Sequence, residues 1–232
     1  MRRVTAREAN QRFSEVLSAV ETGEQVVITK RGRPVALMSP YPAEALAAER
    51  QAAIDRMIAS MNEPVTLRGR FRTFTRDRNA RVLMSCTFDT NILVYTLEQP
   101  ADVKRQRAQS LIIRGARRQT AVLLLQPLAE FSYVATRKFG VSVASVRRRV
   151  NGWCGGFPVQ PAAEPDLGAA LDLVSAHNIS FWDALLCATS IRMGLSFLMT
   201  EDLQDGRSLH GLTIVNPFRP VNDALVDHIL PP

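Results

Sequence analysis

Apolar residues at helical spacing and short β-rich runs organise the first 61 positions of this chain. One apolar stripe predicts a helix that ends near Gly23, with its residues at Ala9, Phe13, Val16, Leu17 and Val20. Thr5 and Glu8 stand at the spacing of a capping box at the start of that helix. Two strands are predicted at 25–29 and 34–39, joined by a basic turn, and an Ala- and Glu-rich helix at 43–61. This module is too small to bury much core alone, which favours a homodimer or higher homo-oligomer.

From position 84 onward, short apolar runs alternate with amphipathic segments. We expect strands ending at Asp89 and at 121–125, 157–160, 196–199 and 212–215. We expect helices at about 101–118, 127–139, 142–152, 165–176 and 182–193. Such alternation predicts an α/β/α sandwich around a mostly parallel sheet, preceded here by a small α+β domain. In sheets of this kind the ligand crevice lies at the carboxyl ends of the strands.

The segment between the two modules follows neither a helical nor a strand period. Residues 62–83 hold six arginines together with a proline and a glycine, and we interpret them as a basic linker. The predicted domains are therefore 1–61, the linker 62–83, and 84–232. Met84 would serve as a natural start residue, so the chain looks like two adjacent reading frames joined into one.

Charge is divided unevenly between the modules. Residues 1–83 contain 15 Lys and Arg against 9 Asp and Glu, a net of +6, and residues 84–232 contain 14 against 13, a net of +1. A basic N-terminal third predicts that this part faces a polyanion. No apolar run is long enough to cross a bilayer and no signal peptide is evident, so we expect a cytoplasmic protein with no membrane partner.

Four acidic residues of the second module stand at the edges of apolar runs: Asp89, Glu130, Asp183 and Asp202. A carboxylate at the edge of a buried element costs desolvation energy unless a cation or hydrogen bonds compensate it. Four brought together would repel one another unless a hard divalent metal lay among them, and oxygen ligands suit Mg²⁺ or Mn²⁺. All four can converge at the crevice, because Asp89 and Asp202 follow strands and Glu130 and Asp183 lie near helix starts.

The N-terminal pattern resembles a known family of antitoxins. The stretch from Thr5 to Ala36, above all Thr-Lys-Arg-Gly-Arg-Pro-Val-Ala at 29–36, is similar to the Phd/YefM type. The resemblance implies a dimer that binds operator DNA, with candidate contacts at Arg7, Asn10, Lys30, Arg31 and Arg33. Arginine and lysine supply phosphate contacts, and arginine supplies bidentate base contacts. The alternative is that the Lys-Arg-Gly-Arg turn is a solvated hairpin tip.

The second module resembles the PIN domain of VapC-type toxin ribonucleases. The matching pieces are Phe-Asp89-Thr-Asn91-Ile-Leu-Val-Tyr, Glu130 in its helix, Phe-Trp-Asp183-Ala-Leu-Leu-Cys-Ala, and Leu-Met-Thr200-Glu-Asp202. The resemblance implies endonucleolytic cleavage of RNA, with the four acids as catalytic metal ligands for Mg²⁺ or Mn²⁺. Thr90, Asn91 and Thr200 would orient water or carboxylates around them. Lys104, Arg105 and the run Arg147–Arg149 are candidate contacts to the RNA backbone.

Several alternatives stay open at this level. One of Arg68, Arg70, Arg72 or Arg76 can pair with the acidic cluster and block it, or the linker can be a simple tether. The fusion can be a self-inhibited or inactive nuclease that acts as a DNA-binding transcriptional autoregulator. Metal ligands alone are equally compatible with a phosphatase or a DNA nuclease, and RNA is preferred by resemblance.

Overall fold

The computed structural model describes residues 2–40, 43–62, 86–97 and 102–232, and it divides into two compact units. Unit 1 comprises residues 1–49 and unit 2 comprises residues 50–232, so the boundary falls inside one helix, α3 (Ala43–Asn62). The linker arginines proposed above as inhibitory, Arg68, Arg70, Arg72 and Arg76, lie outside the described residues. No helix within the described ranges is both long and apolar enough to cross a membrane.

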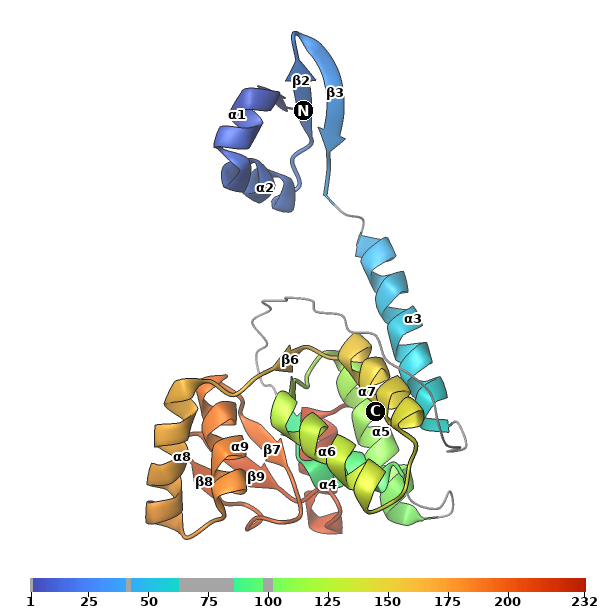
Figure 1. The fold of residues 1–232 in the computed structure, drawn as a ribbon, viewed down its shortest axis with the longest axis vertical. Coiled ribbons are helices and arrows are strands. Elements are labelled where there is room, and N and C mark those ends of the chain that lie inside the picture. The colour runs from blue at the N-terminus through green and yellow to red at the C-terminus, as the bar shows by residue number, and fades with distance from the viewer. Residues whose placement is uncertain (1, 41–42, 63–85, 98–101) are drawn as a thin grey trace. The chain divides into compact units, whose positions relative to one another are not determined.

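Unit 1 is a three-stranded sheet covered by two short helices (Figure 1). Its elements are β1 (Arg2–Thr5), α1 (Ala6–Gln11), α2 (Phe13–Glu21), β2 (Val26–Lys30) and β3 (Arg33–Met38). β1 runs parallel to β2, and β2 runs antiparallel to β3. The core of unit 1 is formed by apolar side chains from its helices and strands, namely Val4, Ala9, Val16, Val20 and Val26.

The single N-terminal helix predicted from sequence is wrong, because the chain leaves helical geometry at Arg12 (φ −124°, ψ 36°). The break lets Ala9 of α1 and Val16 of α2 reach the same core, while Phe13 stays about half exposed. The predicted capping box is confirmed: Thr5 Oγ1 accepts from Glu8 N at 3.2 Å, and Thr5 N donates to Glu8 Oε2 at 2.8 Å. The strand β1 was not predicted, since only Val4 of its four residues points inward.

Unit 2 has the mixed α/β architecture expected from the alternating pattern. Its strands are β4 (Cys86–Phe88), β5 (Leu123–Leu124), β6 (Val159–Gln160), β7 (Phe197–Met199), β8 (Ser208–Leu209) and β9 (Leu212–Val215). Its helices after α3 are α4 (Thr90–Tyr95), α5 (Val103–Arg118), α6 (Leu125–Arg137), α7 (Val143–Gly156), α8 (Glu164–His177), α9 (Phe181–Arg192), the 3₁₀ turn η1 (Pro220–Asn222) and α10 (Asp223–Ile229).

The sheet of unit 2 is mostly parallel, as predicted. Strands β4, β7 and β9 are parallel neighbours, and β8 adds an antiparallel edge to β9. β5 pairs in parallel with β6, and a parallel bridge between Cys86 and Ala121 brings the segment of β5 beside β4. The carboxyl ends of β4, β5 and β7 therefore open toward one edge of the sheet, where Asp89, α6 and Thr200 follow them.

Two apolar clusters fill unit 2, one on each side of the sheet. One contains Phe88, Phe131 and Trp153 with residues of α5, α6, α7 and α10. The other joins α8 and α9, which pack side by side, to Leu198 and Ile214 of the sheet (Figure 1). The first cluster also takes in Ile54, Met57 and Met61 of α3, so the second half of that helix is part of the core of unit 2.

Close glycine contacts explain how α3 approaches α7. A Cβ at Gly152 would lie 3.0 Å from Ser60 Oγ and 3.2 Å from Met57 Cα, and one at Gly156 would lie 3.1 Å from Met57 Sδ. The carboxyl end of α3 is held by Arg149, whose Nη2 donates to the carbonyls of Ser60 (3.2 Å) and Met61 (3.3 Å). A basic side chain at this end also complements the helix dipole.

Candidate active site

Asp89 is placed by the end of β4 and the start of α4. Its N–H donates to Met199 O at 3.0 Å, which continues the pairing of β4 with β7 by one residue. Its side chain then caps α4, accepting from Thr90 N at 2.6 Å. The result is a carboxylate only 7% exposed at the carboxyl edge of the sheet.

Two side chains, Thr200 after β7 and Asn91 on α4, tie Asp89 to Asp202. Thr200 Oγ1 donates to Asp89 Oδ2 at 2.6 Å and accepts from Asp202 N at 3.1 Å. Asn91 Nδ2 lies 3.4 Å from Asp89 Oδ2, 3.3 Å from Thr200 Oγ1 and 3.1 Å from Asp202 Oδ2. Because all three neighbours of that nitrogen accept, the orientation of the Asn91 amide is fixed. Its Oδ1 atom is buried and receives no hydrogen bond from the described residues.

Glu130 joins the same edge through α4. Thr90 Oγ1 donates to Glu130 Oε2 at 2.8 Å, and Gln126 Nε2 donates to Glu130 Oε1 at 2.9 Å. Gln126 Nε2 also donates to Trp182 O at 2.9 Å, which links α6 to the first turn of α9. Glu130 lies on a helix that begins at Leu125, two residues earlier than the predicted start at Pro127.

Asp183 lies in the first turn of α9, where Ser180 is the N-cap. Asp183 N donates to Ser180 Oγ at 3.1 Å, and Ser180 Oγ donates to Asp183 Oδ2 at 2.7 Å. Its negative charge reaches both Asp89 and Cys187, because it helps to raise the pKa of each. Gln126 adds a geometric link, because it binds both Glu130 and the carbonyl of Trp182, the residue before Asp183.

Burial is the main cause of an unusual pKa at Asp89. Desolvation raises this pKa, the hydrogen bonds from Thr200 and Thr90 lower it, and the charges of Asp202 and Asp183 raise it again, to about 6. Desolvation together with the carboxylates of Asp183 and Asp89 likewise raises the pKa of the Cys187 thiol to about 12. The site thus accumulates negative charge that a cation would relieve.

The donor set suits a hard divalent cation in its chemistry. The groups around Asp89 are oxygens of carboxylates, threonines and an unpartnered amide carbonyl, which are the ligands that Mg²⁺ and Mn²⁺ prefer. Within the described ranges, however, no three His, Cys, Asp or Glu side chains are gathered closely enough to form a ready-made metal cage. An ion at this site would be coordinated by a few protein oxygens directly and by water at its remaining positions, which is the usual arrangement for Mg²⁺.

Sequence reasoning missed two groups of residues at this edge. Gln126 was overlooked, although it stands four residues before Glu130 and so shares its helix face. The second group flanks Asp202 and holds the partners of Lys104, which was predicted only as an RNA contact: Lys104 Nζ donates to Glu201 Oε2 at 2.7 Å and to Tyr95 Oη at 2.9 Å, and the Tyr95 hydroxyl donates to Glu201. Glu201 follows β7 and is 97 positions from Lys104 on α5, so no local pattern could have revealed this pairing.

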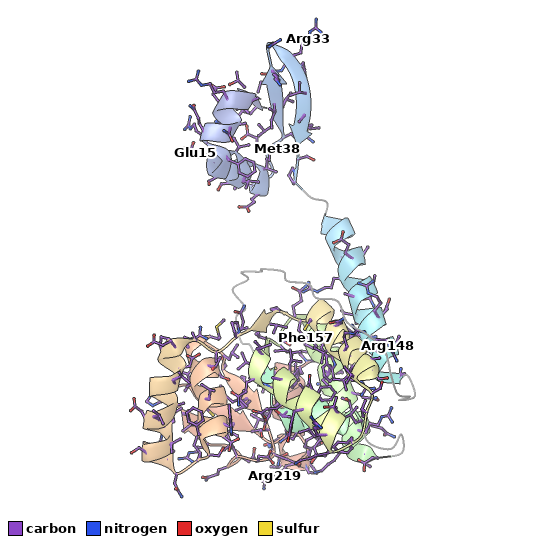
Figure 2. The ribbon with its side chains drawn as sticks, in the orientation of Figure 1. Glu15, Arg33, Met38, Arg148, Phe157 and Arg219 are labelled. Carbon is purple, nitrogen blue, oxygen red and sulfur yellow. The ribbon has the colours of Figure 1, made fainter. Side chains whose placement is uncertain are left out.

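The candidate DNA-binding residues of unit 1 are all exposed. Lys30 ends β2 and Arg33 begins β3, so Arg33 lies at the tip of the hairpin (Figure 2). Arg31 and Gly32 form the turn with φ of 52° and 76°. The register opposes Thr5 to Thr29, so α1, which carries Arg7 and Asn10, starts at the end of the sheet where this turn lies.

One candidate RNA contact is wrong. Arg149 is only 4% exposed, and besides holding the end of α3 it donates to Thr96 O and Thr96 Oγ1, both at 3.1 Å. It is a structural residue that connects α3 to the end of α4. The triple-arginine run hid this difference, because α7 buries one of the three positions and exposes its neighbour Arg148.

Comparison with known proteins gives two family matches that cover separate parts of the chain. The model for the antitoxin Phd_YefM of type II toxin–antitoxin systems matches residues 1–60, and the PIN domain model matches residues 86–204. Antitoxin VapB46 from two strains of Mycobacterium tuberculosis is 57% identical over 42 residues. That match covers 18% of this chain and 41% of the relative, so the chain spans about two fifths of the length of these relatives.

Three solved structures are similar at low identity. A toxin–antitoxin complex from Klebsiella pneumoniae has a TM-score of 0.43 at 20% identity, covering 58% of this chain and 98% of that one. VapC20 of M. tuberculosis, described as a Sarcin-Ricin loop cleaving toxin, gives 0.41 at 18%, covering 51% and 92%. VapBC2 from Rickettsia felis, bound to a DNA fragment from its promoter, gives 0.43 at 18%, covering 56% and 97%.

The two family matches lie end to end and agree with the motifs in each part of the sequence. The PIN domain match alone takes in 119 of the 232 residues, more than half of the chain. The chain therefore belongs to the PIN domain family and carries, ahead of that domain, a Phd/YefM-type antitoxin domain.

Proposed function

We propose that unit 2 is an endoribonuclease that depends on Mg²⁺ or Mn²⁺ and hydrolyses RNA phosphodiester bonds. The observation that carries the proposal is the hydrogen-bonded group Asp89–Thr200–Asn91–Asp202 at the carboxyl edge of the sheet. Asp183 adds its charge to this group, and Thr90 ties Glu130 to it. Clustered carboxylates of this kind repel one another and are stabilised by a divalent cation.

In this proposal Asp89, Glu130, Asp183 and Asp202 hold the ion, directly or through water. When bound, a divalent cation lowers the pKa of coordinated water and offsets charge that develops on a phosphate. Thr200 and the N–H of Thr90 fix the Asp89 carboxylate, and Thr90 Oγ1 with Gln126 fixes Glu130. Asn91 spans Asp89 and Asp202, and its buried Oδ1, which has no hydrogen-bond partner among the described residues, would orient a water beside them.

The test of the nuclease uses the full chain and residues 50–232, which keep the α3 segment that fills the core of unit 2. We expect RNA cleavage with Mg²⁺ or Mn²⁺, no cleavage in EDTA, and loss of activity in Asp89→Asn and Asp183→Asn. Asp172→Asn is the matched control, because Asp172 is an exposed acid on α8. Equal cleavage by the fragment in EDTA, or by both active-site variants, would contradict the metal-dependent mechanism.

We also infer that unit 1 binds operator DNA through Arg7, Asn10, Lys30, Arg31 and Arg33. The exposure of all five, their place at one end of the small sheet and the positive charge of this part of the chain support the inference. The salt dependence of binding measures such interactions, because each phosphate that the protein no longer neutralises lowers the log–log slope by about 0.9.

A gel-shift titration at several salt concentrations tests the DNA interface. Arg31→Ala with Arg33→Ala should weaken binding and flatten the slope. The control pair Arg117→Ala with Arg118→Ala removes the same charge from the exposed end of α5. If both pairs weaken binding equally, the effect is one of net charge and the hairpin is not the interface.

The second candidate function is a self-inhibited PIN protein that acts as a DNA-binding autoregulator. The observation that favours it is that Ile54 and Met57, which lie within the antitoxin match, pack in the core of unit 2 with the PIN domain. Three RNase rates decide between the functions: the full chain, residues 50–232, and the full chain with Arg68, Arg70, Arg72 and Arg76 changed to Ser. Inhibition that disappears on the Arg→Ser changes assigns it to the linker arginines. Equal rates for the full chain and the fragment would exclude inhibition in cis.

A further inference from the structure

Two large aromatic side chains stand exposed beside the carboxylates. Trp182 is 61% exposed and immediately precedes Asp183, and Tyr133 is 63% exposed and lies three residues after Glu130. Exposed tryptophan is uncommon, since this side chain is highly buried on average in folded proteins. The other tryptophan, Trp153, is fully buried in the core of unit 2 and shows that ordinary behaviour.

Helix geometry places Tyr133 on the same side of α6 as the site. Residues three or four apart on a helix share a face, so Gln126, Glu130 and Tyr133 form one stripe. Successive turns rise by about 5.4 Å, so Tyr133 stands about one turn beyond Glu130. Arg137 ends α6 one turn later and Lys138 follows it, and both are exposed basic residues.

A hydrogen bond to its backbone carbonyl holds Trp182 beside the site. Gln126 Nε2 donates both to Trp182 O and to Glu130 Oε1, each at 2.9 Å, so the first turn of α9 is fastened to this stripe of α6. The indole also makes an edge-to-face contact with Phe181, with centroids 5.6 Å apart and planes at 70°. These contacts fix the start of the side chain and leave most of the ring open to solvent.

A buried acceptor at the Trp182 end of this stripe points to a ligand. Gln126 Oε1 is buried and receives no hydrogen bond from the described residues. Its amide cannot be turned the other way, because the nitrogen faces two acceptors, Glu130 Oε1 and Trp182 O. A ligand with hydroxyl or amino donors would satisfy this oxygen, and both a ribose and a nucleobase carry such groups.

We propose that Trp182 and Tyr133, named here the aromatic platform, stack unpaired bases of an RNA strand on either side of the phosphate held at the carboxylates. The inference rests on the proposed nuclease function and assigns the contacts with the bases to these two side chains. Every base has an apolar face, so aromatic rings bind single strands with little sequence preference. Bases paired within a duplex are stacked on each other and are not available to the rings.

The first experiment uses the fluorescence of Trp182 in the full chain. Acrylamide should quench one of the two tryptophans, and that fraction should be absent in Trp182→Phe. A single-stranded RNA oligonucleotide should quench the same fraction in Ca²⁺ or EDTA, whereas its duplex and an abasic ribose-phosphate strand should not. Quenching by acrylamide but not by RNA overturns the proposal. Absence of acrylamide quenching overturns it as well, because the ring would then be covered.

The second experiment measures affinity for fluorescein-labelled RNA by anisotropy. Trp182→Ala and Tyr133→Ala should each weaken binding about 5- to 150-fold, the range found when one stacked aromatic is removed. Trp182→Phe and Tyr133→Phe should restore most of the affinity. Phe139→Ala is the control, because Phe139 is an exposed aromatic past the end of α6. Equal losses for Phe139→Ala and the platform variants would refute specific stacking.

The outcomes separate this proposal from the nuclease proposal. If the chain binds single strands through the platform but cuts no RNA with any metal, the platform stands and the nuclease function falls. If the chain cuts RNA in a metal-dependent way and none of the platform variants changes affinity, the nuclease stands and the platform falls.

Discussion

Replacing Met57 by alanine should destabilise unit 2 and leave unit 1 unchanged. Met57 is 0% exposed and packs in the same cluster as Ile54, Met61 and Trp153, although it precedes the PIN domain match in sequence. The sulfur also contacts α7, where a Cβ at Gly156 would come within 3.1 Å of it. The side chain is therefore enclosed on several sides, and its loss leaves a cavity that neighbours cannot readily fill.

The magnitude follows from this burial. Truncating a fully buried methionine to alanine costs about 2–5 kcal/mol of unfolding free energy. In a unit of this size each kcal/mol lowers Tm by about 2–4 °C. A central value of about 3 kcal/mol therefore predicts a decrease of about 6–12 °C.

Tryptophan fluorescence during urea or thermal unfolding is the suitable assay. Both tryptophans, Trp153 and Trp182, lie in unit 2, so the signal follows that unit alone. Arg56→Ala is the matched control on the exposed side of α3. If Met57→Ala and Arg56→Ala unfold with the same midpoint as the parent, α3 does not contribute to the core in solution and the reasoning is refuted.

Three further predictions concern charge and packing around the site. The pKa of Asp89 is raised from 3.8 to about 6, so its charged form opposes folding. Without metal, the unfolding free energy should therefore fall by about 3 kcal/mol as pH rises from about 4 to 6. In urea titrations, Asp89→Asn or added Mg²⁺ should reduce that fall. An unchanged pH profile in Asp89→Asn would exclude the Asp89 carboxylate as its origin. Gly152→Val should lower the Tm of unit 2 by calorimetry, because its Cβ would meet Ser60 at 3.0 Å, whereas Gly168→Ala, where nothing lies within 4 Å, should not. Arg149→Ala should lower the free energy of unfolding in urea by about 3 kcal/mol or more, because the carbonyls at the end of α3 and Thr96 lose their hydrogen bonds. A decrease below about 0.5 kcal/mol would show that water replaces the hydrogen bonds of Arg149.

Much of the fold and the general place of the site could be predicted from local patterns. The strand before Asp89 and the helix that carries Glu130 follow from apolar periodicity, and the carboxyl edge of a parallel sheet is where ligands bind. The helix break at Arg12 could not be predicted, because it depends on how α1 and α2 share one small core. The pairing of Lys104 with Glu201 could not be predicted either, since it joins residues 97 positions apart.

The role of α3 was hidden for a different reason. Its helical propensity is plain from residues 43–61, but propensity does not indicate which neighbour a helix packs against. The packing partner of α3 is determined by α7, where Gly152 and Gly156 allow the two helices to approach closely. Arg149 of α7 also donates hydrogen bonds to the carbonyls at the end of α3. A glycine within a helix usually lowers stability, so its value here appears only once the partner is known.

Because α3 packs in the core of unit 2, the covalent connection between α3 and β4 affects how strongly that core is held together. The chain contributes to that core first through α3 and again from β4 onward, so the described segments on either side of residues 63–85 belong to one folded body. Bringing together two segments separated by 23 residues of sequence costs little entropy, and tethering supplies an effective concentration on the order of mM. A docking that is only micromolar between separate chains would then be occupied about 1,000 to 1 within this one. Cutting the chain between α3 and β4 would turn this intramolecular contact into one that depends on protein concentration, so the covalent connection keeps α3 in the core at any dilution.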